Sequence, residues 1–557
     1  MNSSLFVSIL SADSYVIHDK QAGFSMTQTF KPITFFLIIS TLGLLKTHAH
    51  EQLSEPVDLT SLPAQVAQAL DKFATPGMAV GVAYKGRIIH LEGYGKRDIK
   101  NDLAVTATTQ FRIGSTSKAF TVASLGILVD EGKLSWEDKV TDHLPEFKMM
   151  DPWVTAEFTI RDLLTHKSGL VSGAGDSMIW PEPSGFSRQE VISKLRYLTP
   201  RYSFRSQYAY SNVMYITAAE IVAKITQMPW ERFVDTRIFA PLNMNCYAGD
   251  MAAQALKNVA KGYDVNSSID FYEIPRNGIN GKTLMSAAAG GIVCNAQDML
   301  KWVNYLLTLN EQLNSEDEVF ETQVFSPQRL KEMWSPTTIL PLAKRERENN
   351  QTHIKTYGLG WRLFDADGLQ LVSHTGTISG FQAFVTLVPK LELGIVLLSN
   401  GSNSGARASI MQTILKAFVS PNDGYDWVQD EFEYREVRKQ EYLANWQEPK
   451  GTNTVLLAPS NYLGTFEDKW FGKIIIENTK GKLRIYSDRM LSLTGTLKPF
   501  NEHSFKIVWD NQNAASNAFI HFNTDINSVV TSFTLAPFKV EEPENHEYLD
   551  MFFIKID

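Results

Sequence analysis

Ser115 and Lys118 are the two residues whose types and spacing point most directly to catalysis. They open an apolar run from Ser115 to Glu131, whose pattern predicts a buried helix ended by Gly132. A spacing of three places both side chains on one helix face, and burial lowers the pKa of an amine. A neutral amine beside a hydroxyl activates a serine nucleophile without histidine. The alternative, an N-cap serine and a surface lysine, is disfavoured because an apolar helix leaves Lys118 no solvent-facing side.

Tyr210 and Asn212 stand at the entry of a second predicted helix, over 212–226. A phenol at its reference pKa of about 10 is only about 0.1% ionised at neutral pH, so Tyr210 acts as a base only beside a cation such as Lys118. Asn212 suits a hydrogen bond to a substrate amide or to Lys118. The tripeptide is a weak signal alone, because these residue types also suit a helix entry.

The third polar segment is His374-Thr375-Gly376, followed by Thr377. If it forms a sheet edge beside Ser115, Gly376 lets a substrate approach the backbone. The backbone N–H groups of Ser115 and Thr377 then form an oxyanion hole. A lone histidine before a Thr-Gly pair is more often structural, so this segment is also weak by itself.

Several predicted elements must position these segments. Alternating residues predict a β-hairpin over 76–96 and a second, buried hairpin over 381–399 that turns at Pro389-Lys390. Further helices are expected over 231–240 and 296–308. Strand pairs at both ends of a helix-rich middle predict an α+β unit whose sheet is closed by sequence-distant strands. Short alternating runs around Lys480-Gly481 predict a separate small β-barrel or sandwich.

The three polar segments, in this order, resemble the serine β-lactamase and penicillin-binding-protein superfamily, on its class C and D-stereospecific peptidase side. The matching motifs are Ser-x-x-Lys, Tyr-x-Asn and a His-Thr-Gly in place of Lys-Thr-Gly, within about residues 60–415. Other family-like stretches are Leu163–Leu170, Pro241–Met244, Ala289–Ile292 and Tyr357–Trp361. The resemblance implies a β-lactamase/transpeptidase-like fold, an antiparallel sheet flanked by helices plus a helical subdomain. The tail around Tyr462–Phe466 is more loosely similar to the lipocalin-like β-domain of some members.

The resemblance also implies the role of each site residue. Ser115 is the acylated nucleophile, Lys118 its proton partner, and Tyr210 the base for attack and for the hydrolytic water, assisted by Asn212. The backbone N–H groups of Ser115 and Thr377 hold the oxyanion, Thr375 and Gly376 bind substrate, and His374 replaces the family's lysine. No Glu-x-x-Leu-Asn segment is present, which argues against a class A mechanism and leaves Tyr210 as the candidate for deacylation.

His374 is the main departure from the family pattern. A lysine there supplies a permanent cation for the carboxylate of a β-lactam or a peptide C-terminus, whereas a histidine with a pKa near 6.5 is mostly neutral at pH 7. We therefore expect a serine hydrolase that acts on an ester, an amide or a D-configured peptide. The alternatives are a class C-like β-lactamase or D-alanyl-D-alanine carboxypeptidase, and a sensor that binds penicillin or peptidoglycan fragments without turnover.

Composition, charge and the absence of several motifs limit the kinds of partner and cofactor that the protein is expected to bind. The 557 residues include 53 basic and 61 acidic side chains, a net charge of −8, which argues against a nucleic-acid partner. We find no His-Glu-x-x-His or Cys-x-x-Cys set, no Gly-x-Ser-x-Gly elbow and no P-loop, so no metal or cofactor is expected. The expected partner is a small-molecule or peptide substrate, with a cell-wall fragment as one option, and the oligomeric state is open.

The chain divides into four expected parts. Residues 1–49 form an extension and a signal peptide, and the signal peptide starts at Met26 and is cut near Ala49. A signal peptide implies a periplasmic or secreted protein. The rival interpretation of this segment is a short membrane anchor. Residues 50–420 form the hydrolase domain, 421–455 a charged helix and linker with a lid as the alternative, and 456–557 the β-barrel. Cys246 and Cys294 either form a disulfide or stay as buried thiols.

Overall fold

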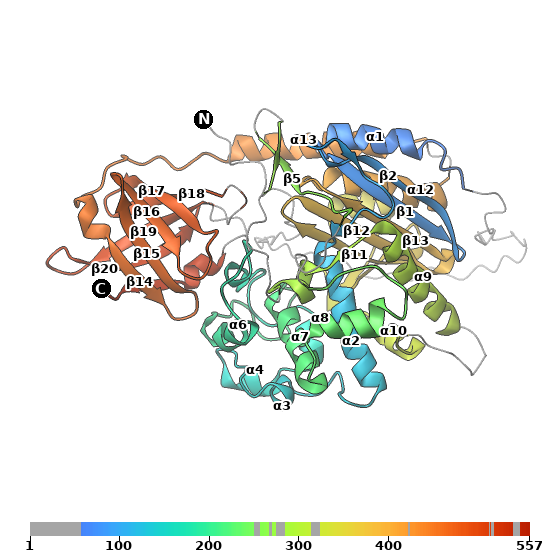
Figure 1. The fold of residues 1–557 in the computed structure, drawn as a ribbon, viewed down its shortest axis with the longest axis horizontal. Coiled ribbons are helices and arrows are strands. Elements are labelled where there is room, and N and C mark those ends of the chain that lie inside the picture. The colour runs from blue at the N-terminus through green and yellow to red at the C-terminus, as the bar shows by residue number, and fades with distance from the viewer. Residues whose placement is uncertain are drawn as a thin grey trace, which may run out of the picture.

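The computed structural model describes residues 57–249, 257–266, 270–274, 284–313, 324–421, 424–511, 513, 517–538 and 546–557. The expected leader, with Met26 and Ala49, lies outside these residues. The chain folds into an α+β unit followed by an all-β barrel, as the sequence predicted (Figure 1). Within the described ranges, no helix combines the length and the apolarity needed to span a bilayer.

An antiparallel nine-stranded sheet forms the centre of the α+β unit. Its strands are β1 (Gly77–Tyr84), β2 (Arg87–Asp98), β3 (Leu103–Ala104), β8 (Thr338–Ile339), β9 (Lys355–Tyr357), β10 (Arg362–Ala366), β11 (Leu369–Ile378), β12 (Phe381–Val388) and β13 (Leu393–Ser399). Their order across the sheet is β3-β2-β1-β13-β12-β11-β10-β9-β8. Both predicted hairpins are confirmed, and β1 pairs with β13, so sequence-distant strands close the sheet as expected.

Helices cover both faces of the sheet, and others form a separate helical part beside it (Figure 1). They are α1 (Leu62–Lys72), α2 (Lys118–Asp130), α3 (Val140–His143), α4 (Pro152–Glu157), α5 (Ile160–Leu164), α6 (Arg188–Lys194), α7 (Val213–Thr226), α8 (Trp230–Val234), α9 (Ala296–Leu313), α10 (Pro327–Met333), α11 (Lys344–Asn350), α12 (Gly405–Val419) and α13 (Trp427–Asn445). The helices expected over 212–226, 231–240 and 296–308 correspond to α7, α8 with its following π-helical turn, and α9. The predicted apolar helix begins at Lys118 rather than Ser115, because a single 3-10 turn precedes it.

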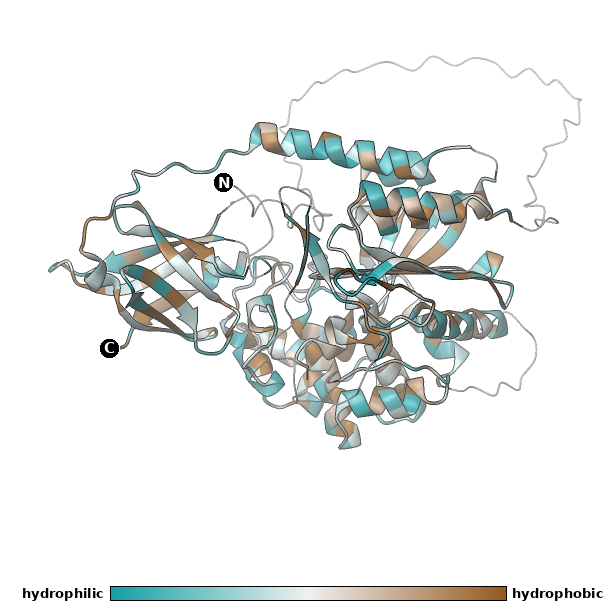
Figure 2. Cartoon of the chain, turned by 45° about the horizontal axis from the view of Figure 1, so that its top comes forward, coloured by the Kyte–Doolittle hydropathy of each residue, from teal (hydrophilic) through white to brown (hydrophobic). Residues whose placement is uncertain are grey.

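Two hydrophobic clusters hold the layers together. Apolar side chains of α1 and α12 pack on one face of the sheet, and α9 packs on the other face against β1 and β13 (Figure 1). The charged helix α13 lies against α1 and α12 in the outer layer, where it exposes mostly hydrophilic residues (Figure 2). This place argues against a lid over Ser115, the alternative for that segment. The helix α2 is buried from Lys118 to Leu128, which confirms the prediction of an enclosed helix.

The C-terminal strands close into the expected barrel. They are β14 (Gly464–Asp468), β15 (Gly472–Thr479), β16 (Lys482–Ser487), β17 (Thr494–Asn501), β18 (Ser504–Trp509), β19 (Ala518–Thr524), β20 (Val530–Pro537) and β21 (Phe552–Lys555). Aromatic rings fill its interior, with Phe466, Phe522 and Phe533 in mutual contact. The barrel lies beside the helical part of the α+β unit, near α6 (Figure 1).

Cys246 and Cys294 are joined as a disulfide with a Cα–Cα distance of 4.4 Å. This finding settles the choice that the sequence left open between a bridge and two thiols. Cys294 lies on the short strand β7 (Val293–Cys294), which pairs with β4 (Phe111–Arg112) just before Ser115. The disulfide therefore ties down the strand pair that leads to Ser115.

Candidate active site

A single 3-10 turn, η1 (Gly114–Ser117), presents Ser115 between β4 and α2. Side-chain bonds hold this turn, because Thr116 Oγ1 donates to Ile113 O at 2.8 Å and Ser117 Oγ donates to Gly114 O at 2.7 Å. Thr116, Ser117 and Lys118 are buried, whereas Ser115 keeps partial exposure. The nucleophile candidate is thus rigidly held and still accessible to a substrate.

Lys118 is fully buried, and its Nζ lies within hydrogen-bond distance of three oxygen atoms. Its Nζ lies 2.7 Å from Asn212 Oδ1, 2.7 Å from Ala289 O and 3.3 Å from Ser115 Oγ. Burial lowers the pKa of Lys118 well below its usual value. A neutral amine has two N–H donors and one lone pair. The two short bonds occupy the donors, so the lone pair remains for the proton of Ser115.

Tyr210 and Asn212 enter the site from the segment that leads into α7. Lys118 Nζ sits 4.6 Å from the centre of the Tyr210 ring. Burial raises the pKa of the Tyr210 phenol, and the nearby Ser115 hydroxyl partly offsets that rise. The Tyr210 hydroxyl makes no hydrogen bond of ordinary geometry with a described residue. Tyr210 therefore rests as a neutral phenol, free to exchange a proton with a substrate.

His374 lies in the same cluster but does not contact Ser115. Its Nδ1 is 2.7 Å from Thr375 O, and its Nε2 is 3.0 Å from the Tyr357 hydroxyl. A carbonyl accepts only, so Nδ1 carries the proton and Nε2 accepts from Tyr357. Burial and the nearby Arg362 lower the pKa of His374 well below its usual value. His374 is therefore neutral and supplies no cation, as its residue type predicted.

The strand β11 reaches the nucleophile through two glycines. A Cβ on Gly376 would lie 2.0 Å from Ile113 O, and a Cβ on Gly114 would lie 2.7 Å from Thr377 N. Gly114 also has a φ of +52°, which side-chain-bearing residues rarely adopt. These close approaches bring the backbone amide of Thr377 beside that of Ser115. The two N–H groups of the predicted oxyanion hole are therefore neighbours.

Three contributors to the site were missed by the sequence analysis. Asp176 accepts from Asn212 Nδ2 at 2.9 Å, Ala289 binds Lys118 through its carbonyl, and Arg362 on β10 donates to Thr375 Oγ1 at 3.1 Å. Ala289 and Arg362 lie within or next to stretches noted as family-like, Ala289–Ile292 and Tyr357–Trp361. Asp176 stands in a segment with no recognised motif.

Arg362 places a permanent positive charge at the site. It is partly exposed, pairs with Ser373 on the neighbouring strand β11, and lowers the pKa of both Lys118 and His374. An arginine stays protonated in proteins and binds carboxylates bidentately. The charge that His374 lacks is thus present on the neighbouring strand, next to Thr375.

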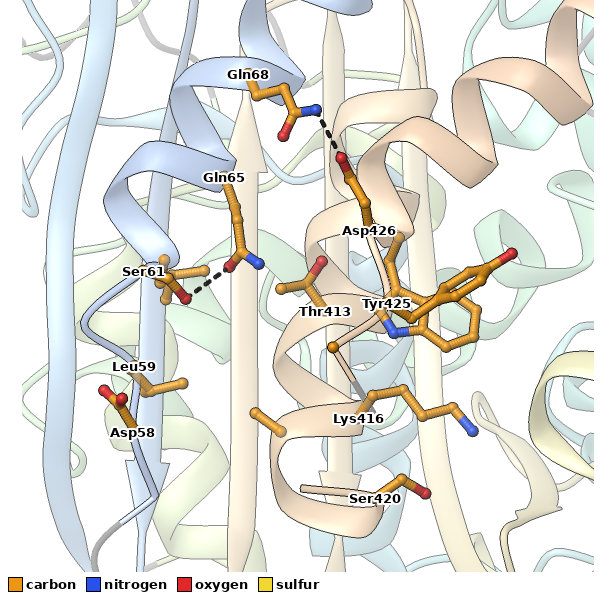
Figure 3. A pocket seen from close by; sticks show the side chains of 14 residues that line it. Asp58, Leu59, Ser61, Gln65, Gln68, Thr413, Lys416, Ser420, Tyr425 and Asp426 are labelled. Atoms are coloured by element: carbon orange, nitrogen blue, oxygen red, sulfur yellow. Dashed lines mark hydrogen bonds between the residues drawn. The ribbon is translucent and has the colours of Figure 1, made fainter. Parts of the chain in front are cut away.

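A separate hollow of about 360 Å³ lies between α1, α12 and the start of α13 (Figure 3). Its lining includes Gln68 and Asp426, which are hydrogen-bonded at 3.0 Å, and Lys416, which is paired with Asp367. Neither Ser115 nor any of its partners lines it. Among the described residues, no group of histidine, cysteine and carboxylate side chains has the arrangement of a metal site.

Comparisons with known proteins find similar sequences over most of the chain. The β-lactamase family model matches residues 63–417, and a domain of unknown function, DUF3471, matches residues 448–548. The unguisins hydrolase ungD' of Aspergillus campestris is 29% identical over 471 residues, which span 80% of this chain and 82% of that protein. Protein flp of Staphylococcus aureus is 25% identical over 335 residues, which span 59% of this chain and 61% of that protein.

Solved structures share the fold. The octameric penicillin-binding protein homologue from Pyrococcus abyssi superposes with a TM-score of 0.57 at 19% identity, covering 89% of this chain and 100% of that one. SurE, solved with D-Leu, superposes with a TM-score of 0.50 at 17% identity, covering 89% and 99%. The family match spans more than half of the chain and includes Ser115, Lys118, Tyr210 and Asn212, so this protein belongs to the β-lactamase family.

Proposed function

We propose that this protein is an exported serine hydrolase that forms an acyl-enzyme at Ser115 and cleaves an ester, an amide or a D-configured peptide bond. One observation carries the proposal. The buried Nζ of Lys118 lies 2.7 Å from Asn212 Oδ1, 2.7 Å from Ala289 O and 3.3 Å from Ser115 Oγ, so an uncharged amine that donates to the first two turns its lone pair toward Ser115. A lysine in this state is a base, and a serine beside it is a nucleophile.

Acylation follows from these positions. Ser115 Oγ forms a bond to the substrate carbonyl carbon while its proton passes to Lys118 Nζ. The negative charge that develops on the carbonyl oxygen is bound by the N–H groups of Ser115 and Thr377. As the scissile bond breaks, the leaving oxygen or nitrogen takes the proton of the Tyr210 phenol, and the Lys118 ammonium restores it.

Deacylation reverses the roles with water as the nucleophile. Water attacks the acyl carbon and its proton passes through Tyr210 to Lys118. The Ser115–acyl bond then breaks, and Ser115 Oγ recovers a proton from Lys118. The raised pKa of Tyr210 fits a residue that relays protons from a neutral resting state better than one that rests as a phenolate base.

A second candidate, hydrolysis of a β-lactam or of a peptide with a free C-terminal carboxylate, is favoured by Arg362. The sequence argued against such substrates because His374 carries no charge. A guanidinium 3.1 Å from Thr375 Oγ1 supplies a cation from the neighbouring strand. An Arg362→Met enzyme should then lose activity on carboxylate-bearing substrates at least about 10-fold more than on neutral esters.

Export is supported by the Cys246–Cys294 disulfide, since such bonds persist mainly in oxidising compartments. Hydrolysis, as opposed to binding without turnover, is supported by the similarity to a protein named as an unguisins hydrolase.

Intact-mass measurement tests the proposal. The wild-type protein should gain one fluorophosphonate adduct and hydrolyse an activated ester, and Ser115→Ala should do neither. Ser124→Ala is the matched control, because Ser124 lies on the same helix and donates only to Phe120 O at 2.8 Å. A wild type that takes no adduct and turns over no ester refutes the proposed function. A penicillin adduct that persists would identify the non-turnover sensor instead.

A further inference from the structure

One of the contacts between the C-terminal barrel and the catalytic unit is made by a buried carboxylate, that of Glu547. This residue lies on η8 (His546–Asp550), a single turn between β20 and β21. Its carboxylate accepts from Gly175 N at 2.8 Å, from Ser177 N at 3.0 Å and from the Ser177 hydroxyl. A buried charge with three donors on one short segment fixes the backbone of that segment.

The residue between those two amides is Asp176, which is linked to Ser115 by a series of hydrogen bonds. Asp176 Oδ2 accepts from Asn212 Nδ2 at 2.9 Å, and Asn212 Oδ1 accepts from Lys118 Nζ at 2.7 Å. The chain of contacts ends at Ser115, 3.3 Å from Lys118. Asp176 Oδ2 fixes which end of the Asn212 amide faces Lys118, because it accepts from the NH₂ end and leaves the amide oxygen for the amine.

We propose that Glu547 of the C-terminal barrel is a positioning residue for catalysis, which holds Asp176 and Asn212 so that Lys118 acts as the base for Ser115. The inference rests on the proposed function, and it assigns a task to the barrel in the same chain. Positioning through such outer contacts matters because a small displacement of a catalytic group greatly slows a reaction.

Charge gives this contact a second effect. Glu547 is buried and Asp176 is partly buried, and burial raises the pKa of each, that of Glu547 to about 7. Glu547 accepts three hydrogen bonds and Asp176 accepts one, so a single negative charge on the pair settles on Glu547. Asp176 therefore stays protonated, and an anion that would raise the pKa of Lys118 is kept away from the amine.

The other charged and titratable groups around the pair are few. On the barrel side, Asp550 raises the pKa of Glu547 and is itself paired with Arg201, and Glu547 raises the pKa of Tyr548. On the catalytic side are Lys118 and Tyr210. In Glu547→Gln the negative charge moves to Asp176, next to Lys118. The pKa of Lys118 then rises.

Other contacts hold the barrel in place without Glu547. Arg489 binds both carboxylate oxygens of Glu190, at 2.6 and 2.7 Å, and donates to Gly185 O at 3.1 Å. Ser492 Oγ donates to Glu182 O at 3.1 Å. A Glu547→Gln variant should therefore stay docked, and Arg489→Met is a matched control that weakens the interface but leaves the Glu547 contacts intact.

The test is the rate at which a fluorophosphonate labels Ser115, followed by intact mass between about pH 6 and pH 10. In Glu547→Gln the acid limb of the pH profile should move to higher pH. The labelling rate at neutral pH should fall roughly 10- to 100-fold, and at high pH the labelling rates of the variant and the wild type should become equal. Arg489→Met should keep the wild-type limb. A purely structural role for Glu547 would lower the rate at every pH instead.

Two results overturn the inference: a wild-type pH profile in Glu547→Gln, or an equal shift in Arg489→Met. Hydrogen exchange at the amides of Gly175 and Ser177 measures their hydrogen bonds to Glu547 independently of turnover. Faster exchange in Glu547→Gln but not in Arg489→Met supports the contact, and unchanged exchange overturns it. Absence of labelling in the wild type refutes the proposed function, and the exchange result still decides whether Glu547 holds the loop.

Discussion

Replacing Gly376 with alanine tests how β11 completes the site. The new Cβ would lie 2.0 Å from Ile113 O, and real Cβ contacts essentially never fall below 3.0 Å. The other atom is backbone, so β11 and the segment before Ser115 must separate by about 1 Å, a displacement that alone slows a reaction on the order of 100-fold. The adjacent amide of Thr377 moves with the strand and leaves the oxyanion. Loss of one such donor lowers kcat about 10²- to 10³-fold, or about 2.7–4 kcal/mol.

The assay is kcat/KM on an activated ester, with the rate of fluorophosphonate labelling as a second readout. Thermal unfolding accompanies it, because overpacking of this kind lowers the free energy of unfolding by about 1–3 kcal/mol. Gly249→Ala is the control, since its Cβ would meet only the Glu231 side chain at 3.6 Å. A folded Gly376→Ala enzyme that keeps more than about half of the wild-type rate would refute the role given to the Thr377 amide.

Three further predictions concern Lys118 and the disulfide. Lys118→Met should lower the labelling rate of Ser115 about 10²- to 10⁴-fold, the usual contribution of a general base, and undiminished labelling would exclude Lys118 from that role. In the wild type the neutral amine of Lys118 is the active form, so activity should be lost as the pH falls through the lowered pKa of Lys118. A pH profile whose acid limb lies at or above the reference lysine pKa of about 10.4 would contradict this. The disulfide spans a sequence separation of 48, so its reduction should lower the free energy of unfolding by about 4 kcal/mol. The measurement is Tm with and without dithiothreitol, and Tm should be lower with it. An unchanged Tm would show that the bridge does not stabilise the folded state.

The elements that carry the nucleophile were predictable because their signals are local. Ser115 and Lys118 are three residues apart, and the apolar pattern that follows them dictates burial of the amine whatever surrounds it. The hairpins over 76–96 and 381–399 were predictable for the same reason, since alternation and turn residues are properties of short segments.

The charge at the substrate site was not predictable. His374 is neutral by residue type, and the structure keeps it neutral through burial and two hydrogen bonds. The cation comes from Arg362, which reaches Thr375 only because β10 pairs with β11. Arg362 stands 12 positions before His374, and nothing in the sequence indicates that their strands pair. The sequence therefore argued against carboxylate-bearing substrates without counting the positive charge of Arg362.

The sequence by itself predicted Ser115 as the nucleophile with Lys118 as its proton partner, the neutral state of His374, and the α+β and barrel architecture, because each follows from residue type and short-range spacing. Only the tertiary structure decided that Asp176 orients Asn212, that Arg362 supplies the positive charge, and that Glu547 of the barrel holds the loop around Asp176. Hydrogen bonds and Coulomb interactions act over a few ångströms of space regardless of chain separation. Glu547 and Gly175 are 372 residues apart and meet at 2.8 Å, a proximity that no local pattern encodes.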